Sequence, residues 1–230
     1  MGVPIEIIAD SIGIWKNRLS SKFCQDVIAI FDSKEALARA EYEGEGDIHD
    51  SYEHGGLLWR NDRKRIDIST TMSLFRSMDP YVRELESVLH ECSHEYFKWF
   101  QQRQMEMDPT ADRGRESWEI DKQPMVYKMQ KTYAGGGFCQ FHHEQGPDPY
   151  TIIRYGVWML YLNDVTRGGT TDFPVQNVRL APTEGTFVLW PAAYTHPHRG
   201  SPDLDETKYI VTGWFEHPQD WKKGDCGCED

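Results

Sequence analysis

Hydrophobic and polar positions divide the chain into a first half with helical patterns and a second half with strand patterns. Between residues 20 and 40, apolar side chains recur at helical spacing with charged side chains between them, which predicts an amphipathic helix. A stronger helical pattern follows Asp79 and Pro80, which provide an N-cap and a proline in the first turn. We expect Asp108 and Pro109 to end this second helix.

The segments outside these helices have other patterns. Residues 41–63 are acidic, glycine-rich and without periodicity, so we expect a loop there, whereas the alternation over residues 65–70 predicts a short strand. After about residue 122, runs rich in Val, Ile, Tyr, Trp and Thr alternate with turn residues, a pattern typical of a sandwich or jelly roll. The strands predicted from these runs are 124–133, 152–162, 177–180, 186–190 and 209–215.

These patterns favour one domain that is mainly β with α support, a jelly-roll core flanked by N-terminal helices. We expect residues 1–121 to form a mostly helical N-terminal support, residues 122–217 the jelly-roll core, and residues 218–230 a polar tail. A chain of 230 residues is long enough to bury a core of this size without disulfides or structural metals.

The charge of the chain restricts its partners. It has 25 basic and 37 acidic residues, for a net charge of −12, whereas proteins that bind nucleic acid need a basic face to neutralise phosphates. We therefore expect no nucleic-acid partner and no attachment to an anionic membrane, while a basic peptide or a small molecule stays open. No apolar run approaches membrane-spanning length, and charges interrupt the start of the chain too early for a secretory signal. The oligomeric state is left open by the sequence.

The five cysteines do not describe a disulfide framework, because their number is odd and they are widely spread. This usage favours a reducing, cytoplasmic compartment. Cys226 and Cys228 lie in the polar, glycine-bearing tail, where a soft-metal site or a redox pair is the alternative to a simple frayed end. We favour the frayed end.

One candidate metal site lies in the second predicted helix. His90, Glu91 and His94 match the H-E-x-x-H pattern of zinc metallopeptidases, in which two histidines one turn apart bind Zn²⁺ and the glutamate is the general base. The match has only three fixed positions and no downstream third ligand is evident. An ordinary amphipathic helix with two half-exposed histidines explains it more simply.

A second candidate lies in the strand-rich half. His142 and Glu144 are two residues apart, so on a strand both side chains point to the same side and reach one metal. His198 follows 56 residues later in a proline-rich turn. Two imidazoles and one carboxylate leave coordination positions open on an iron, as an oxygenase requires. By itself this spacing is weak, and the surrounding motifs strengthen it.

Four segments resemble, in order and spacing, motifs of the prolyl 4-hydroxylase-like branch of the Fe(II)- and 2-oxoglutarate-dependent oxygenases. They are residues 133–144 (YAGGGFCQFHHE, similar to Y-x-x-G-G-x-x-x-x-H-x-D), 154–165 (RYGVWMLYLNDV, similar to R-x-x-T-x-L-x-Y-L-N-D-V), 168–174 (GGTTDFP, similar to G-G-x-T-x-F-P), and 198–202 (HRGSP), which precede Lys208. The resemblance runs from about residue 126 to residue 217 and leaves the N-terminal half without a match.

The resemblance implies a fold, a reaction and a set of cofactors. The fold is the double-stranded β-helix form of the jelly roll. The reaction is hydroxylation of a C–H bond by a dioxygenase, with a prolyl residue of a peptide or a related amino acid as the leading substrate. The cofactors are Fe(II), 2-oxoglutarate as co-substrate, O₂, and ascorbate as a candidate reductant.

The resemblance also implies roles for individual residues. The implied iron ligands are His142, Glu144 and His198; the implied 2-oxoglutarate contacts are Lys208, Tyr161 and Tyr133; the implied substrate-side residues are Arg154 and Trp214.

This sequence departs from the family at two positions. Glu144 stands where the family usually has aspartate, and Val157 replaces the threonine of the strand motif. Glutamate is one methylene longer, so iron affinity and reaction outcome are open at this point. The alternatives are the zinc metallopeptidase of residues 90–94 and a jelly-roll binding protein that has lost catalysis.

Overall fold

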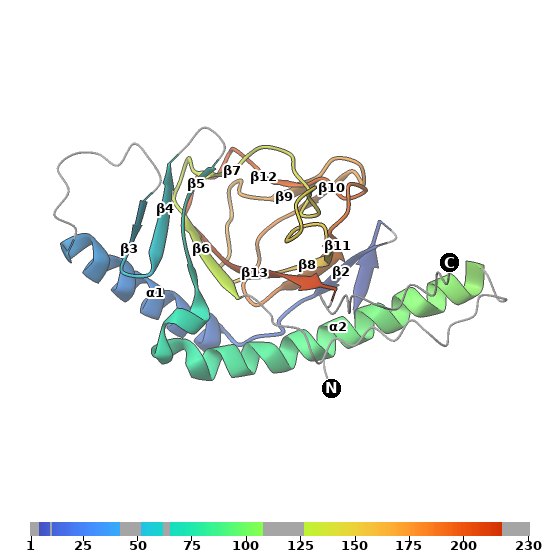
Figure 1. Ribbon diagram of the computed structural model, residues 1–230, viewed down its shortest axis with the longest axis horizontal. Helices are drawn as coiled ribbons and strands as arrows, with labels where there is room; N and C mark the ends of the chain where they lie inside the picture. Colours follow the sequence, from blue (N-terminus) through green and yellow to red (C-terminus); the bar gives the residue numbers. More distant parts are fainter. Residues whose placement is uncertain (1–4, 10, 42–51, 62–64, 108–126, 218–230) are drawn as a thin grey trace, which may run out of the picture.

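The computed structural model describes residues 5–9, 11–41, 52–61, 65–107 and 127–217, and Figure 1 shows their arrangement. The helices are α1 (Ser21–Glu41) and α2 (Asp79–Met107), with 3-10 turns at Met72–Leu74 and Arg76–Met78. The strands are β1 (Glu6–Ile8), β2 (Ile12–Trp15), β3 (Tyr52–His54), β4 (Leu57–Asn61), β5 (Arg65–Thr71), β6 (Lys128–Thr132), β7 (Gly137–Phe138), β8 (Arg154–Tyr161), β9 (Thr171–Phe173), β10 (Val178–Leu180), β11 (Phe187–Pro191), β12 (Arg199–Gly200) and β13 (Lys208–Glu216).

The strands form two antiparallel sheets that face one another. The large sheet has ten strands in the order β1-β2-β11-β8-β13-β6-β5-β4-β3, with β7 paired to β5 off this path. The small sheet has the order β10-β9-β12. Strands from the first and second halves of the chain pair in the large sheet, since β2 pairs with β11 and β5 pairs with β6. The space between the two sheets is the interior of the jelly roll (Figure 1).

Each strand of the large sheet serves two packing layers, because successive side chains point to opposite faces. On β11, Phe187 and Leu189 pack toward the helices, whereas Val188 and Trp190 pack into the jelly roll. The two helices lie together against the outer face of this sheet (Figure 1). Apolar residues at helical spacing hold them there, among them Phe23, Val27, Phe31, Leu85 and Leu89.

A buried polar contact also joins α1 to the large sheet. The ammonium group of Lys131 donates hydrogen bonds to Asp32 Oδ1 and Glu35 Oε2, each at 2.8 Å. Burial raises the pKa of Glu35, but hydrogen bonds from Lys131 and Tyr133 outweigh it and lower the pKa overall. Lys131 therefore points away from the jelly-roll interior and holds the helical layer in place.

The predicted jelly-roll fold with N-terminal helices is confirmed. Both helices and the five strands predicted after residue 122 are present within a few residues of the expected bounds, and β5 matches the strand predicted over residues 65–70. The division into an N-terminal support, a core and a tail stays a prediction. The support region contributes five strands, β1 to β5, to the same sheet as the core. Cys226 and Cys228 lie outside the described residues.

The prediction of a loop over residues 41–63 was wrong for its second part. There β3 and β4 form a hairpin in which Tyr52 pairs with Trp59, turning on Gly55 and Gly56. Both glycines have positive φ, 58° and 76°, as the two central residues of a type I′ hairpin turn require. This two-glycine turn was the sequence signal for the hairpin.

Candidate functional site

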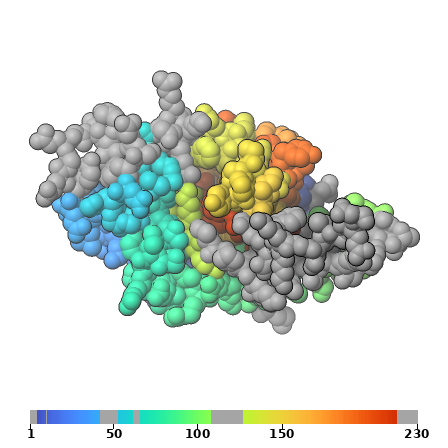
Figure 2. Space-filling view, in the orientation of Figure 1, coloured from blue at the N-terminus to red at the C-terminus, as the bar shows by residue number. Residues whose placement is uncertain are grey.

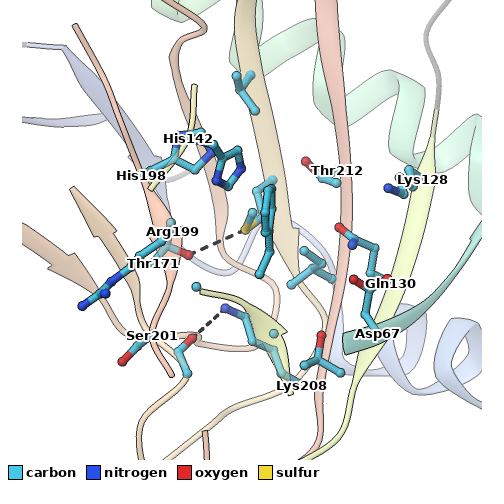
Figure 3. A pocket seen from close by; sticks show the side chains of 18 of the residues that line it. Asp67, Lys128, Gln130, His142, Thr171, His198, Arg199, Ser201, Lys208 and Thr212 are labelled. Carbon is cyan, nitrogen blue, oxygen red and sulfur yellow. Dashed lines mark hydrogen bonds between the residues drawn. The ribbon is translucent and has the colours of Figure 1, made fainter. Parts of the chain in front are cut away.

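The two candidate histidine ligands are joined through their backbones. His142 N donates to His198 O at 3.0 Å, and His198 N donates to His142 O at 2.8 Å, which forms an isolated antiparallel bridge. The centroids of the two imidazole rings are 4.5 Å apart. In Figure 3 the two side chains lie beside each other at one end of a cavity. Backbone pairing thus brings together side chains that are 56 residues apart in the sequence.

Glu144 completes this group. Its Oε1 lies 3.4 Å from His142 Nε2 and 3.7 Å from His198 Nε2. One ligand atom from each of the three residues lies within 4.8 Å of the others, and in the described part of the chain this is the one such group. Burial raises the pKa of Glu144, but the two histidines outweigh it and hold the pKa well below its usual range. The carboxylate is therefore ionised and ready to bind a cation, and the donor set of two imidazoles and one carboxylate fits iron.

The cavity extends from this group to a buried lysine. Lys208 lines the cavity and is 8% exposed, and its Nζ donates to the carbonyl oxygen of Gly169 at 2.6 Å. Burial lowers the pKa of Lys208 from its ordinary value of 10.5 to about 8, while the charge of Asp172 raises it slightly. Figure 3 shows Lys208 away from the two histidines, with other lining side chains drawn between them. The cavity therefore has a candidate metal group at one end and a cation for an acidic ligand at the other.

Comparison with known proteins finds similarity in the part of the chain that carries this site. The sequence profile of the 2OG-Fe(II) oxygenase superfamily matches residues 127–216, which contain both ends of the cavity. Over these residues the chain is similar to the 2OG-Fe(II) oxygenase superfamily. The superfamily implies Fe(II), 2-oxoglutarate and O₂ as cofactors.

The curated relatives that resemble this chain are subunits of prolyl 4-hydroxylase. The α-1 subunit of prolyl 4-hydroxylase from Gallus gallus is 29% identical over 107 residues, which are 40% of this chain and 21% of that protein. The subunit from Homo sapiens is 27% identical over 95 residues, 36% of this chain and 18% of that protein. The matching part of the chain thus spans about a fifth of the length of these relatives.

Solved structures show the same fold at low sequence identity. A Pseudomonas putida prolyl-4-hydroxylase has a TM-score of 0.58 at 15% identity and covers 90% of this chain and 93% of its own. The viral collagen prolyl hydroxylase of Paramecium Bursaria Chlorella virus-1, in a complex with 2OG, has a TM-score of 0.54 at 17% identity, with 89% and 94% coverage. A Trichoplax adhaerens prolyl hydroxylase, in complex with a peptide fragment, has a TM-score of 0.57 at 16% identity, with 90% and 83% coverage.

The two tyrosines expected to contact 2-oxoglutarate lie outside the cavity wall. Tyr161 is buried behind it, where its hydroxyl shares a hydrogen bond of 2.7 Å with Thr171 Oγ1. Thr171 lines the cavity in its place. Tyr133 lies on the helix side of the sheet and donates to Glu35 Oε1 at 2.7 Å, whereas Thr132 lines the cavity.

Of the two expected substrate-side residues, one lines the cavity and the other does not. Trp214 lines the cavity, whereas Arg154 lies behind Trp214 with its guanidinium carbon 3.9 Å from the centroid of the indole ring. Arg154 Nη1 lies 3.4 Å from Glu144 Oε2. Arg154 is therefore within contact of a candidate metal ligand and does not line the cavity.

Sequence reasoning missed the part of the cavity wall formed by β5 and β6. Asp67, Lys128 and Gln130 line the cavity together with Thr132 and Thr212 (Figure 3). The alternation of Lys128, Gln130 and Thr132 on β6 was a usable signal, since these polar residues share one face of the strand. Strand pairing between β5 and β6 brings Asp67 to the same wall.

The zinc-binding pattern on α2 does not form a site of three ligands within the described residues. His90 and His94 are exposed with their ring centroids 6.4 Å apart, and Glu91 accepts a hydrogen bond of 2.5 Å from Arg18. The three residues lie on the helical layer, and none of them lines the cavity of the jelly roll. No described helix of this chain has the length and apolar character to cross a bilayer.

Proposed function

We propose that this chain is an Fe(II)- and 2-oxoglutarate-dependent dioxygenase that hydroxylates a C–H bond, with iron held by His142, Glu144 and His198. The observation that carries the proposal is the convergence of these three ligand atoms within 4.8 Å at one end of a cavity whose other end holds the buried Lys208. Two imidazoles and a carboxylate leave room for a chelating co-substrate and O₂.

Lys208 is proposed to bind the distal carboxylate of 2-oxoglutarate. A buried ammonium group without a neighbouring carboxylate is costly, and an ion pair with a ligand carboxylate offsets that cost. Thr171 lies beside this end of the cavity, with its hydroxyl held by Tyr161. Tyr161 is therefore proposed to orient Thr171, and we propose no contact of Tyr133 with 2-oxoglutarate.

Bound iron, with 2-oxoglutarate and O₂, supplies the oxidising power for the reaction. One oxygen atom of O₂ enters the substrate C–H bond as a hydroxyl group, and the other enters the succinate that forms as 2-oxoglutarate loses CO₂. The protein binds and orients the reactants and excludes water. Apolar residues of the jelly-roll interior provide the water-excluding wall, among them Val157, Met159, Trp190, Ile210 and Trp214.

The proposed substrate is a prolyl residue of a peptide. The curated relatives are prolyl 4-hydroxylase subunits, and one of the similar structures is a prolyl hydroxylase with a bound peptide fragment. Apolar side chains are exposed on the segment between β7 and β8, which carries His142: Phe141 is 49% exposed, Tyr150 75% and Ile152 51%. This segment is the yellow region on the surface in Figure 2. Exposed apolar groups beside a reactive centre favour a peptide over a small metabolite, and the net charge of −12 favours a basic one.

The test is release of succinate from 2-oxoglutarate by the purified protein with Fe(II) and O₂. Basic proline-rich peptides and free proline are offered in parallel, and mass spectrometry detects products that gain one oxygen atom. We expect turnover with a peptide, its loss in His198→Ala, and its retention in the control His90→Ala. Absence of succinate together with failure to bind both Fe(II) and 2-oxoglutarate would favour a binding protein without catalysis. Oxidation of free proline alone would refute the peptide assignment and leave the oxygenase in place.

A further inference from the structure

The two oxygens of Glu144 face different partners. Oε1 lies toward the imidazoles, 3.4 Å from His142 Nε2 and 3.7 Å from His198 Nε2. Oε2 lies on the other side, 3.4 Å from Arg154 Nη1. Only Oε1 is therefore directed to the place where the three candidate ligand atoms converge.

Arg154 is itself fixed from two further directions. It stands opposite Glu216 in the pairing of β8 with β13, at a register shift that follows Phe215. Its Nε donates to Glu216 Oε1 at 3.3 Å, and its guanidinium plane covers the Trp214 ring at 3.9 Å. The side chains of Arg154 and Glu144 are each 18% exposed. A planar guanidinium can hold two carboxylates and an aromatic face at once, which the ammonium group of lysine cannot do.

This arrangement compensates for the extra length of the Glu144 side chain. A glutamate side chain has one more rotatable bond than aspartate, so more conformational freedom is lost when its carboxylate is held in one orientation. A free carboxylate of this length also presents either oxygen, or both, to a cation. Contact of Oε2 with Arg154 removes this freedom before any ligand binds.

We propose that Arg154 is a positioning residue for the metal site: by holding Glu144 Oε2 it directs Oε1 to the imidazoles, and so makes the longer acidic ligand usable. This proposal rests on the iron site proposed above. It assigns Arg154 to the metal ligand, in place of the substrate contact that the family resemblance implied.

The direction in which metal affinity changes when Arg154 is replaced distinguishes positioning of Glu144 from simple electrostatic repulsion. A guanidinium repels a divalent cation, so removing its charge alone strengthens metal binding. Removing a residue that orients a ligand weakens it, by about 10- to 100-fold for comparable supporting residues. Arg154→Gln thus has opposite expected effects under the two explanations.

The experiment measures the affinity of the protein for Co(II) alone, by calorimetry and by the visible absorption of the bound ion, for four proteins: the wild type, Arg154→Gln, Glu144→Asp and the double variant. We expect Arg154→Gln to weaken binding about tenfold and to change the absorption spectrum. In the Glu144→Asp background the shorter carboxylate does not reach Arg154, so the same substitution leaves the affinity unchanged or raises it. The matched control Arg167→Gln, an exposed arginine paired with Asp205, changes neither quantity.

Three outcomes overturn the inference. Unchanged or tighter Co(II) binding by Arg154→Gln leaves electrostatics as the whole effect. Equal weakening in both backgrounds shows that Arg154 supports the fold and not the longer ligand specifically. Failure of the wild-type protein to bind Co(II) overturns the proposed metal site as well, so the two proposals fail in distinguishable ways.

Discussion

Replacing Lys208 with methionine removes the buried ammonium group at one end of the cavity and keeps a side chain of similar length. In the absence of ligands, the ammonium group donates to the carbonyl of Gly169 and lies 5.3 Å from the centroid of the Tyr161 ring, and no carboxylate of the described residues lies within ion-pairing distance of it. We therefore expect opposite effects on the two properties of the protein: stability without ligand should not fall, whereas affinity for 2-oxoglutarate should.

The pKa of Lys208 sets the size of the stability effect. Burial lowers this pKa from 10.5 to about 8, a difference that corresponds to ~3 kcal/mol. Between these two pH values the unfolded chain binds more protons than the folded one, so wild-type stability rises with pH over this window. Below pH 8 the full cost of burying the charged Lys208 is present. At pH 7 the methionine variant avoids it but leaves the Gly169 carbonyl without its donor, which costs about 1–3 kcal/mol.

The expected net change at pH 7 is therefore between no loss and a gain of ~2 kcal/mol in the free energy of unfolding. Urea unfolding at pH 7 and pH 10 measures it, and the advantage of the variant should shrink or reverse at the higher pH. Loss of the partner of a buried ligand charge costs about 2–5 kcal/mol, so the dissociation constant for 2-oxoglutarate should rise by about 30-fold or more in a calorimetric titration.

Lys131→Met is the matched control, because Lys131 lies on the opposite face of the sheet and pairs with Glu35. It removes one of the two cations that pair with the buried Glu35 and leaves the other, Arg39, in place. It should therefore destabilise the protein by about 1–3 kcal/mol without changing the affinity for 2-oxoglutarate of the folded fraction. A Lys208→Met protein that is less stable at pH 7 by more than about 1 kcal/mol and binds 2-oxoglutarate like the wild type would refute the reasoning.

Three further predictions follow from contacts outside the metal group. Tyr133→Phe removes only a hydrogen bond to Glu35, so we expect a loss of ~1 kcal/mol in urea unfolding and an unchanged dissociation constant for 2-oxoglutarate; a weakened affinity would contradict the position of Tyr133 outside the cavity. Glu35→Gln removes a carboxylate whose folded pKa is lowered, so the wild type should lose more stability than the variant as the pH falls below about 4.5, and parallel acid-unfolding curves would count against the pairing with Lys131. Gly168→Ala adds a methyl group at φ +71° against the carbonyl of Asp203, so thermal unfolding should show a fall of several kcal/mol in stability, and a variant as stable as the wild type would disprove this close approach.

Much of the fold could be predicted from local sequence patterns. The helix over α2 follows from an aspartate and a proline in its first turn and from an apolar stripe, and β8, β11 and β13 follow from their composition. The hairpin of β3 and β4 was missed because its strands are short and its glycines were taken as a sign of a loop. The ten-stranded sheet rests on pairings between distant segments, such as β2 with β11, which no local pattern specifies.

A smaller part of the candidate site could be predicted from the sequence. The family resemblance, with the spacing of its motifs, selected His142, Glu144, His198 and Lys208, all of which line one cavity. Which face of a strand a residue occupies depends on the register at which the strand starts, so the placement of Tyr133 on the helix side of the sheet was not predictable from its motif. The contact between Glu144 and Arg154 depends on side-chain geometry that no spacing encodes.

The backbone bridge between His142 and His198 has a consequence for how such a site changes over time. The two hydrogen bonds that align these positions join main-chain N–H and C=O groups. Every residue has both groups except proline, which lacks the N–H. Substitutions at either histidine can therefore alter or abolish the chemistry while the scaffold persists. The same independence applies to the proposed ligand Glu144, whose backbone amide donates to the carbonyl of Ala192. The proposed chemistry and the architecture are thus free to diverge at separate rates.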